Sequence, residues 1–386
     1  MYVIKEQDKL PMMFWSDYVE NGAMEQARHL ASLPFAYSRT CFMADIHQGF
    51  GMPIGGVLAT KGVVIPNAVG SDIGCGVIAI RTDARCADTP FDDLYKTVQV
   101  IKSTIPTGFK HRDKAIVSLD KENLLTFPKH GEIRKQGIGI FKQLGTLGSG
   151  NHFIEIQRDT TDDFIWIMVH TGSRNIGYSV AKYYRDVAIN LNEKWKSSVP
   201  KYYDLAFLPL DSEEGRDYFE EMNFCMMFGE RNRKVISDLV LEIGGWTSTF
   251  CVECKHNYAV MENHNGKNLL IHRKGAVRAR TGDRVVIPGS QGTSSFIGTG
   301  KGNETSFMSC SHGAGRVYSR KKAKTELSLE DEMKKMDDMN IIHDLRTVNK
   351  LDEAAGAYKD IHTVMEQQSD LVSIDFELVP LAVIKG

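Results

Sequence analysis

Glycine is bunched in this chain, and the two bunches constrain how the chain can fold. Of the 34 glycines, eight lie in residues 49–76 and eight more in residues 282–315. Glycine adopts positive φ easily and lets other groups approach the backbone closely. We therefore expect each stretch to form tight turns, or to bring the backbone close to a ligand or to another segment.

The composition is that of an ordinary globular protein. The chain has 386 residues, 42% hydrophobic and 25% charged, which is enough for one large domain or two ordinary ones and excludes extensive disorder. The formal charge of −2 excludes a protein that binds nucleic acid through a uniformly basic surface, but it does not exclude a local basic groove. We see no membrane span and no secretory signal, and seven cysteines are too few for a disulfide scaffold, so we expect a cytoplasmic protein.

No repeat, low-complexity run or linker divides the chain, so we expect one domain over residues 1–386. Apolar runs typical of strands lie at 63–68, 76–81, 152–157, 164–169, 268–272, 284–287 and 378–384. Patterns typical of helices lie at 94–101, 178–195, 212–241 and from 328 onward. Because strands and helices do not alternate regularly, the pattern predicts an α+β fold, with a helical insertion at about 178–245, rather than a doubly wound sheet.

Two potential metal ligands stand three residues apart in the first glycine-rich stretch. Asp72 and Cys75 occur in the segment Gly-Ser-Asp-Ile-Gly-Cys-Gly at 70–76. A tight loop can direct a carboxylate and a thiolate into one site, and a thiolate can bridge two metal ions. A glycine-rich turn in which Asp72 bonds its own backbone is the competing interpretation, and taken alone the segment favours it.

Histidines at strand ends offer further ligands. His152 follows the glycine loop 145–151, whose amides could bind an anion, and the apolar strand 164–169 delivers His170 to its end. Arg174, four residues beyond His170, could bind phosphate. For any one of these histidines, the simpler interpretation is a polar residue whose hydrogen bonds are made within the protein.

A further histidine follows a cysteine pair. Cys251 and Cys254 suggest a zinc knuckle with His256 as the third ligand, but no second pair follows at regular spacing. We therefore interpret the cysteines as small buried residues and His256-Asn257 as a ligand with a polar orienting group.

His312 is the candidate nucleophile. It lies in Ser-Cys-Ser-His-Gly-Ala-Gly-Arg at 309–316, where only small residues follow it, so a substrate could approach the ring closely. Arg316, four residues on, would reach a phosphate if a helix starts here. The motif is weak by itself because many loops resemble it.

The set of ligands is more informative than any member. Mn²⁺ and Zn²⁺ accept mixed carboxylate, thiolate and imidazole ligands, and five such residues suffice for two ions if Cys75 bridges. The five are Asp72, Cys75, His152, His170 and His256. We interpret His29, His111, His130, His343 and His362 as surface or helix residues and leave His47, His264 and His272 unassigned.

Basic residues also cluster. They are His272, Arg273, Lys274, Arg278, Arg280, Arg284, Arg316, Arg320, Lys321, Lys322 and Lys324. A local basic face suits a phosphodiester backbone. A solvated surface, offset by the acidic run 326–338, is an equally good interpretation of this cluster alone.

Together the motifs resemble the RtcB family of RNA-splicing ligases, from about Asp45 to the terminal Gly386. They are Asp-x-His-x-Gly-x-Gly-x-Pro-Ile-Gly-Gly at 45–56, Asp-Ile-x-Cys-Gly-Val at 72–77, Gly-Ser-Gly-Asn-His-Phe-x-Glu at 148–155, His-x-Gly-Ser-Arg at 170–174, His-Asn-Tyr at 256–258, His-Arg-Lys-Gly-Ala at 272–276, Pro-Gly-Ser at 288–290 and Ser-His-Gly-Ala-Gly-Arg at 311–316. The resemblance implies a single α+β domain with mixed sheets around a central metal and nucleotide cleft. It also implies a GTP- and Mn²⁺-dependent ligase that joins RNA 2′,3′-cyclic phosphate or 3′-phosphate ends to 5′-hydroxyl ends.

The resemblance assigns roles residue by residue. One Mn²⁺ would bind Asp72, Cys75 and His152, the other Cys75, His170 and His256, and His312 would carry GMP as a covalent intermediate. From their positions four residues after His170 and His312, we also expect Arg174 and Arg316 to meet the substrate phosphate. The nucleotide would be surrounded by Asn151, His152, Phe153, Glu155, His256, Asn257, Pro288, Gly289, Ser290, Gln291, Ser295, His312, Gly313, Ala314, Gly315 and Lys385.

Three positions depart from the family pattern, which has Asn, Arg and Met where this chain has Gly74, Ile78 and Gln291. They indicate a divergent bacterial paralogue, dedicated to the repair of a particular broken RNA rather than acting as the general tRNA-type ligase. The resemblance as a whole implies a role in RNA repair or tRNA splicing. The resemblance also implies possible protein partners: an activating protein, or a release-factor-like protein encoded nearby. Two alternatives remain, a dinuclear phosphoesterase that cleaves RNA without covalent guanylylation and a non-catalytic RNA- or metal-sensing module.

Overall fold

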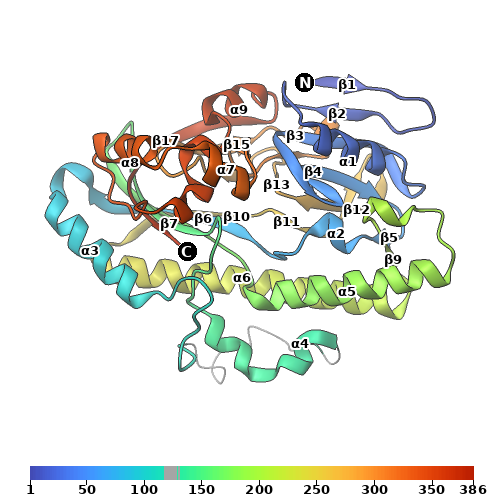
Figure 1. Cartoon of the computed structure of the whole chain (residues 1–386), viewed down its shortest axis with the longest axis horizontal. Helices are drawn as coiled ribbons and strands as arrows, with labels where there is room; N and C mark the ends of the chain where they lie inside the picture. The colour runs from blue at the N-terminus through green and yellow to red at the C-terminus, as the bar shows by residue number, and fades with distance from the viewer. Residues whose placement is uncertain (117–127, 129–130) are drawn as a thin grey trace.

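The computed structural model describes residues 1–116, 128 and 131–386 (Figure 1). The helices are α1 (Asn21–Ala31), α2 (Pro66–Val69), α3 (Phe91–Thr104), α4 (Gly131–Gln136), α5 (Asn175–Lys194), α6 (Glu213–Gly244), α7 (Arg320–Glu326), α8 (Leu329–Asp338) and α9 (Ile361–Gln367). Short 3₁₀ turns are η1 (Cys86–Asp88), η2 (Gly137–Gln143), η3 (Lys201–Tyr203), η4 (Glu304–Ser306), η5 (Val348–Glu353) and η6 (Ala355–Ala357). Within the described residues, no helix combines the length and the apolar composition that a membrane crossing requires.

Two large sheets organise the molecule. The first has the order β1 (Tyr2–Ile4), β2 (Met12–Phe14), β3 (Ala36–Phe50), β4 (Met52–Thr60), β12 (Lys267–Lys274) and β11 (Asn257–His264). The second has the order β10 (Ser248–Lys255), β6 (Gly76–Arg85), β8 (Phe164–Thr171), β7 (Phe153–Asp159), β17 (Val372–Lys385), β15 (Ser295–Gly300) and β14 (Arg284–Ile287). Two small pairs complete the set, β13 (Ala276–Arg278) with β16 (Ser309–Ser311) and β5 (Val63–Val64) with β9 (Leu208–Pro209). The predicted α+β class is confirmed.

The second sheet is apolar on both faces, and the period-two alternation of its strands explains why. In β6, Val77 and Ala79 join the core between the two sheets, whereas Ile78 and Ile80 face a second core. The second core contains Ile236 of α6 and apolar residues of α3. The sheet is therefore buried between the first sheet and a helical layer, which makes it a rigid support for side chains at its ends.

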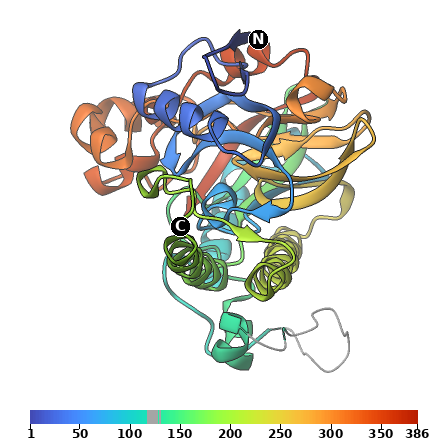
Figure 2. The ribbon, with the colours of Figure 1, turned by 90° about the vertical axis from the view of Figure 1, so that its right-hand side faces the viewer.

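The long helices α5 and α6 run side by side beneath the sheets, as the end-on view shows (Figure 2). Ser212 caps α6 by accepting from the Gly215 amide, and Gly245 ends the helix in the left-handed conformation. α6 lies inside the range predicted as a helical insertion, about 178–245, and α5 begins three residues before that range. Their packing against the sheets gives α6 a direct contact with the loop that carries Cys75, described below.

The predicted strands and helices agree with the structure, with one exception. The run 63–68 was expected to be a strand, but only Val63–Val64 is extended, and α2 begins at Pro66. Proline is favoured at the first position of a helix because its fixed φ suits the helix and its missing N–H is not needed there. His130, which we expected on the surface or in a helix, lies outside the described residues.

Candidate active site

Five side chains that are distant in sequence meet at one end of the second sheet. Asp72 and Cys75 lie in the turn between α2 and β6, and His152 directly precedes β7. His170 lies near the end of β8, and His256 stands between β10 and β11. Because β10, β6, β8 and β7 are consecutive antiparallel neighbours, the starts of β6 and β7 and the ends of β8 and β10 coincide.

Cys75 is at the centre of this cluster. Its Sγ atom lies 3.5 Å from Nε2 of His152 and 3.2 Å from Nε2 of His170. On one side Oδ2 of Asp72 lies 2.9 Å from Nε2 of His152, and on the other Nε2 of His256 lies 3.4 Å from Nε2 of His170. The five side chains thus form a continuous row in space with the thiol in the middle, in the order Asp72, His152, Cys75, His170 and His256.

This donor set fits divalent cations. Imidazole nitrogens that face one another at such distances repel each other unless a proton or a cation lies between them. Nδ1 of His152 lies 3.0 Å from the Leu147 carbonyl, which fixes Nδ1–H as the donor and leaves the Nε2 lone pair free to ligate. The thiol, carboxylate and imidazole donors are those that Mn²⁺- and Zn²⁺-type ions accept, and the central position of Cys75 allows it to serve two ions.

Burial sets the protonation of these groups. Burial lowers the pKa of His170 and of His256 well below the usual value, so both imidazoles are neutral, the form that binds metal. Burial opposes ionisation of Asp72, but the influence of the adjacent His152 ring prevails and lowers the pKa of Asp72 to about 2. Burial and the nearby Asp72 raise the pKa of the Cys75 thiol, and a bound cation would reverse that effect by stabilising the thiolate.

Residues outside the row fix the ligand loop. Arg233 of α6 is fully buried, and its Nη1 donates to the Gly74 carbonyl at 3.0 Å and to the Thr171 carbonyl at 2.8 Å. Asn257 Nδ2 donates to the Asp72 carbonyl at 3.1 Å. Gly74 has φ +75, a conformation that glycine and asparagine tolerate best, so the departure from the family's Asn preserves the turn.

His312 lies beside the row of ligands. Its ring centroid is 4.8 Å from that of His256, and its Nδ1 is 2.6 Å from Oδ2 of Asp45. The same oxygen accepts the backbone N–H of His312 at 3.0 Å. Burial opposes the charge on Asp45, but the His312 contacts lower its pKa below the usual value, so it is a carboxylate. A carboxylate that accepts from Nδ1–H leaves the lone pair on Nε2 of His312.

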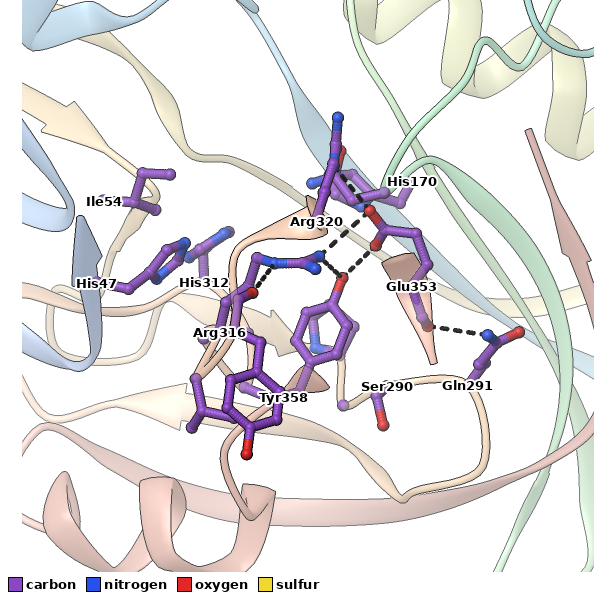
Figure 3. Close-up of a pocket in the computed structure, with 18 of the residues that line it drawn as sticks. His47, Ile54, His170, Ser290, Gln291, His312, Arg316, Arg320, Glu353 and Tyr358 are labelled. Atoms are coloured by element: carbon purple, nitrogen blue, oxygen red, sulfur yellow. Dashed lines mark hydrogen bonds and ion pairs between the residues drawn. The ribbon is translucent and has the colours of Figure 1, made fainter. Parts of the chain in front are cut away.

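A cavity of about 470 Å³ opens in front of His312 (Figure 3). Its walls include most of the residues that the family resemblance placed around a nucleotide: Asn151, Phe153, Glu155, Pro288, Gly289, Ser290, Gln291, His312, Gly313, Ala314, Gly315 and Lys385. His170 also reaches it, so the metal ligands and this cavity are continuous. The volume suits a small-molecule ligand.

Four residues of that set do not line the cavity. His152 and His256 lie in the ligand row instead. Asn257 bonds the ligand loop, and Ser295 Oγ accepts from the Gly289 amide at 3.1 Å and so supports the loop 288–291 from behind.

The two arginines expected to meet phosphate differ. Arg174 stands at the start of α5 with φ +63, and its Nε and Nη2 donate to Thr146 Oγ1 and the Gly108 carbonyl. Arg316 lies in a loop, so the helix start on which its phosphate contact depended is absent there, and its Nη1 donates to Glu353 and to the Tyr358 hydroxyl. Arg316 is therefore already paired with a carboxylate inside the protein.

Several cavity residues were missed by sequence reasoning. Glu353 is almost fully buried and binds Arg316, Arg320 and the Tyr358 hydroxyl (Figure 3). These residues come from a loop-rich stretch without a recognisable spacing. In the sequence Asp45 was only the first residue of the 45–56 motif. Its role as the partner of His312 follows from a contact between residues 267 positions apart.

Two sequence interpretations are corrected by the structure. Cys251 is exposed and Cys254 buried, because residues three apart in a strand face opposite sides, so the two were not a buried pair. The basic cluster is not one basic face: Arg273 is fully buried and paired with Glu262, at 2.6 Å. His272 and Lys274 are buried as well.

Comparisons with known proteins point to one family. The family described as tRNA-splicing ligase RtcB matches residues 26–139 and 131–386. RNA-splicing ligase RtcB of Escherichia coli (strain K12) is 37% identical over 414 residues, with 100% of both chains covered. The tRNA-splicing ligases RtcB of Nanoarchaeum equitans and Thermococcus kodakarensis are 32% and 30% identical, each match covering 95% of this chain and 92% of the relative.

Proposed function

The chain belongs to the RtcB family of tRNA-splicing ligases, and on that premise we propose that it joins RNA 2′,3′-cyclic phosphate or 3′-phosphate ends to 5′-hydroxyl ends, using GTP and two Mn²⁺ ions. One observation supports this most directly. The imidazole of His312 faces a nucleotide-sized cavity on one side and lies 4.8 Å from the ligand His256 on the other. A nucleophile, a base-binding cavity and metal ligands are thus in contact, as guanylyl transfer requires.

The two ions would be bound by Asp72, Cys75 and His152, and by Cys75, His170 and His256. When bound, they would neutralise phosphate charge and polarise phosphorus–oxygen bonds. The chain's own contribution to the first step is the activated imidazole. Asp45 accepts from Nδ1–H of His312 and directs the Nε2 lone pair into the cavity.

In the first step Nε2 of His312 forms a bond to the α-phosphorus of GTP, and the bond from that phosphorus to the bridging oxygen breaks, releasing pyrophosphate. Positive charge develops on the imidazole as the bond forms, and the Asp45 carboxylate stabilises it. In the second step an oxygen of the RNA 3′-phosphate replaces His312 on the same phosphorus. In the third step the 5′-hydroxyl oxygen attacks the RNA phosphorus, loses its proton and releases GMP. A cyclic phosphate must first be hydrolysed to a 3′-phosphate.

Guanine recognition is assigned to the far end of the cavity. Glu155 is buried, and Oε2 accepts from Gln157 at 2.7 Å. A carboxylate there would accept the N–H groups on the Watson–Crick edge of guanine, which adenine lacks. Lys385 lies beside it, with Nζ 5.4 Å from the Phe153 ring centroid, because β17 pairs Lys385 with Phe153. A tag or truncation at the C-terminus should therefore weaken GTP binding.

The decisive test uses GTP radiolabelled at the α-phosphorus, with Mn²⁺ and no RNA. We expect label on the protein that survives alkali, is released by acid and is absent from His312→Ala, as a phosphoramidate would behave. Joining of a nicked stem-loop with 3′-phosphate and 5′-hydroxyl ends should follow when RNA is added.

The same experiment separates the alternatives. A dinuclear phosphoesterase would hydrolyse RNA ends without taking up label, and a metal- or RNA-sensing module would do neither. If the Mn²⁺-loaded protein acts on RNA but never carries GMP, the proposed mechanism is wrong. The physiological RNA, and the activating or release-factor-like partner that the resemblance implies, remain predictions.

A further inference from the structure

A second cavity adjoins the nucleotide cavity. It measures about 320 Å³ and shares Gly49 and Ile54 with the first. Ile54 lies at the opposite end of the first cavity from Gln291 (Figure 3). Ser71, next to the ligand Asp72, also lines the second cavity. The second cavity therefore begins beside the loop that carries Asp72, adjoins the His312 cavity at Gly49 and Ile54, and lies away from the end of that cavity formed by Gln291.

One wall of this cavity is a single face of α5. Tyr178, Lys182 and Arg185 follow at intervals of four and three residues, so they lie above one another on the helix. Tyr178 is 56% exposed, so much of its ring is accessible from solvent. Across from α5, Phe50 at the turn between β3 and β4 is 51% exposed and lines the same cavity.

The charge of the lining has one sign. Lys182, Arg185 and Lys274 line the cavity, and none of its described lining residues is acidic. Lys274 donates to backbone carbonyls and Arg185 bonds Asp186 at 2.8 Å. Among the described residues Lys182 has no hydrogen-bond or ion-pair partner, so its ammonium group is available to a ligand.

We propose that the surface formed by Phe50, Tyr178, Lys182 and Arg185 binds a single-stranded nucleotide of the RNA next to the break. Exposed aromatic faces that stack on bases, combined with cations that meet the backbone, are the chemistry of single-strand binding. The inference rests on the proposed function, because an RNA end placed at the Asp72 and Cys75 ligands must continue in some direction. In the proposed mechanism GTP occupies the first cavity. The RNA strand must therefore continue elsewhere, and the second cavity, which adjoins the first at Gly49 and Ile54, offers that path.

The test measures RNA binding to the Mn²⁺-loaded full chain by fluorescence anisotropy. One probe is an oligoribonucleotide ending in 3′-phosphate, the other begins with 5′-hydroxyl. We expect Tyr178→Ala to weaken binding of one probe about fivefold or more, the range of a lost base stack. We expect Lys182→Ala to reduce the slope of log affinity against log salt by about 0.7, the value for one phosphate contact on a single strand.

Matched controls come from the same helix. Tyr183→Ala removes an aromatic side chain that contacts Tyr184 rather than the cavity, and Lys194→Ala removes an exposed cation at the far end of α5. Both should bind the probes like the unmodified chain. Stoichiometric Mn²⁺ binding checks that each variant is folded, and Lys182→Glu should weaken binding further than Lys182→Ala.

The two probes identify the strand. Weakened binding of the 3′-phosphate probe assigns the surface to the strand that receives GMP, and weakened binding of the 5′-hydroxyl probe assigns it to the strand that attacks. If Tyr178→Ala and Lys182→Glu bind both probes as tightly as the controls, the proposal is wrong. Labelling of His312 with GTP needs no RNA, so failure of the proposed ligase mechanism would be recognised separately.

Discussion

The Nδ1 atom of His312 lies 2.6 Å from Oδ2 of Asp45, although 267 positions separate the two residues in the chain. Asp45 is completely buried, and no solvent competes for this contact. The pair orients the ring and makes Nε2 the free nitrogen, so it is the first feature to test.

Replacing Asp45 with Asn retains the shape of the side chain and removes its charge. We expect the rate of His312 labelling by GTP to fall by about a hundredfold or more, because the carboxylate no longer stabilises the positive imidazole. Mn²⁺ stoichiometry should stay at the unmodified value, since Asp45 is not among the five ligands. Unchanged labelling in Asp45→Asn would show that the pair only packs the site.

The bridging position of Cys75 predicts an unequal loss of metal. Cys75→Ala should abolish binding of both Mn²⁺ ions, whereas Asp72→Asn should remove one, because only Cys75 lies between His152 and His170. Calorimetric titration with Mn²⁺ counts the ions. Cys251→Ser, at an exposed thiol, is the control and should bind two. Loss of a single ion from Cys75→Ala would exclude a bridge.

Glu155 predicts a pH dependence of GTP binding. Burial raises its pKa to about 7, against the opposing effects of Lys385 and Gln157. Below that pH the group is a neutral acid and above it a carboxylate able to accept from guanine. The dissociation constant for GTP should therefore fall as pH rises from about 6 to 8. Glu155→Gln, measured over the same range, should bind GTP weakly and without this change; a parallel pH curve in the variant would assign the titration to another group.

Arg174 and Arg316 should respond differently to substitution. Arg174 lies beside the ligand row, as the influence of Asp72 and Cys75 on its guanidinium indicates, whereas Arg316 is paired with Glu353. We expect Arg174→Ala to slow transfer of GMP to a 3′-phosphate RNA by about tenfold or more relative to its labelling rate, the effect of a lost charged hydrogen bond. Single-turnover transfer from pre-labelled protein measures this step. Arg158→Ala, at an exposed arginine of β7, is the control.

Arg316→Ala has another expected result. It leaves the buried Glu353 carboxylate with fewer partners, so the melting temperature should fall and the transfer step should change in proportion to the labelling step. If Arg316→Ala slowed GMP transfer but not labelling, Arg316 would contact the substrate phosphate, as its position after His312 suggested.

Local sequence patterns predicted part of the fold, whereas β3, β4, β10, β11 and β15 lie outside the runs expected to be strands. Apolar runs predicted the strands that begin beside His152 and lead to His170, and a helical pattern over 212–241 predicted α6. The exception at Pro66 arose because a short apolar run does not distinguish a buried strand from a helix start. The α+β class followed from the irregular order of these elements.

The ligand types were also readable, because carboxylate, thiolate and imidazole side chains stand out at strand ends whatever their neighbours. The sequence by itself therefore determined which residues could bind metal and that His312 was accessible among small residues. It could not determine that Asp45 orients His312, that Glu353 pairs with Arg316, or that Lys182 faces a cavity. Those relationships depend on which strand ends and loops the two sheets bring into contact, and packing between distant segments, rather than local spacing, decides that.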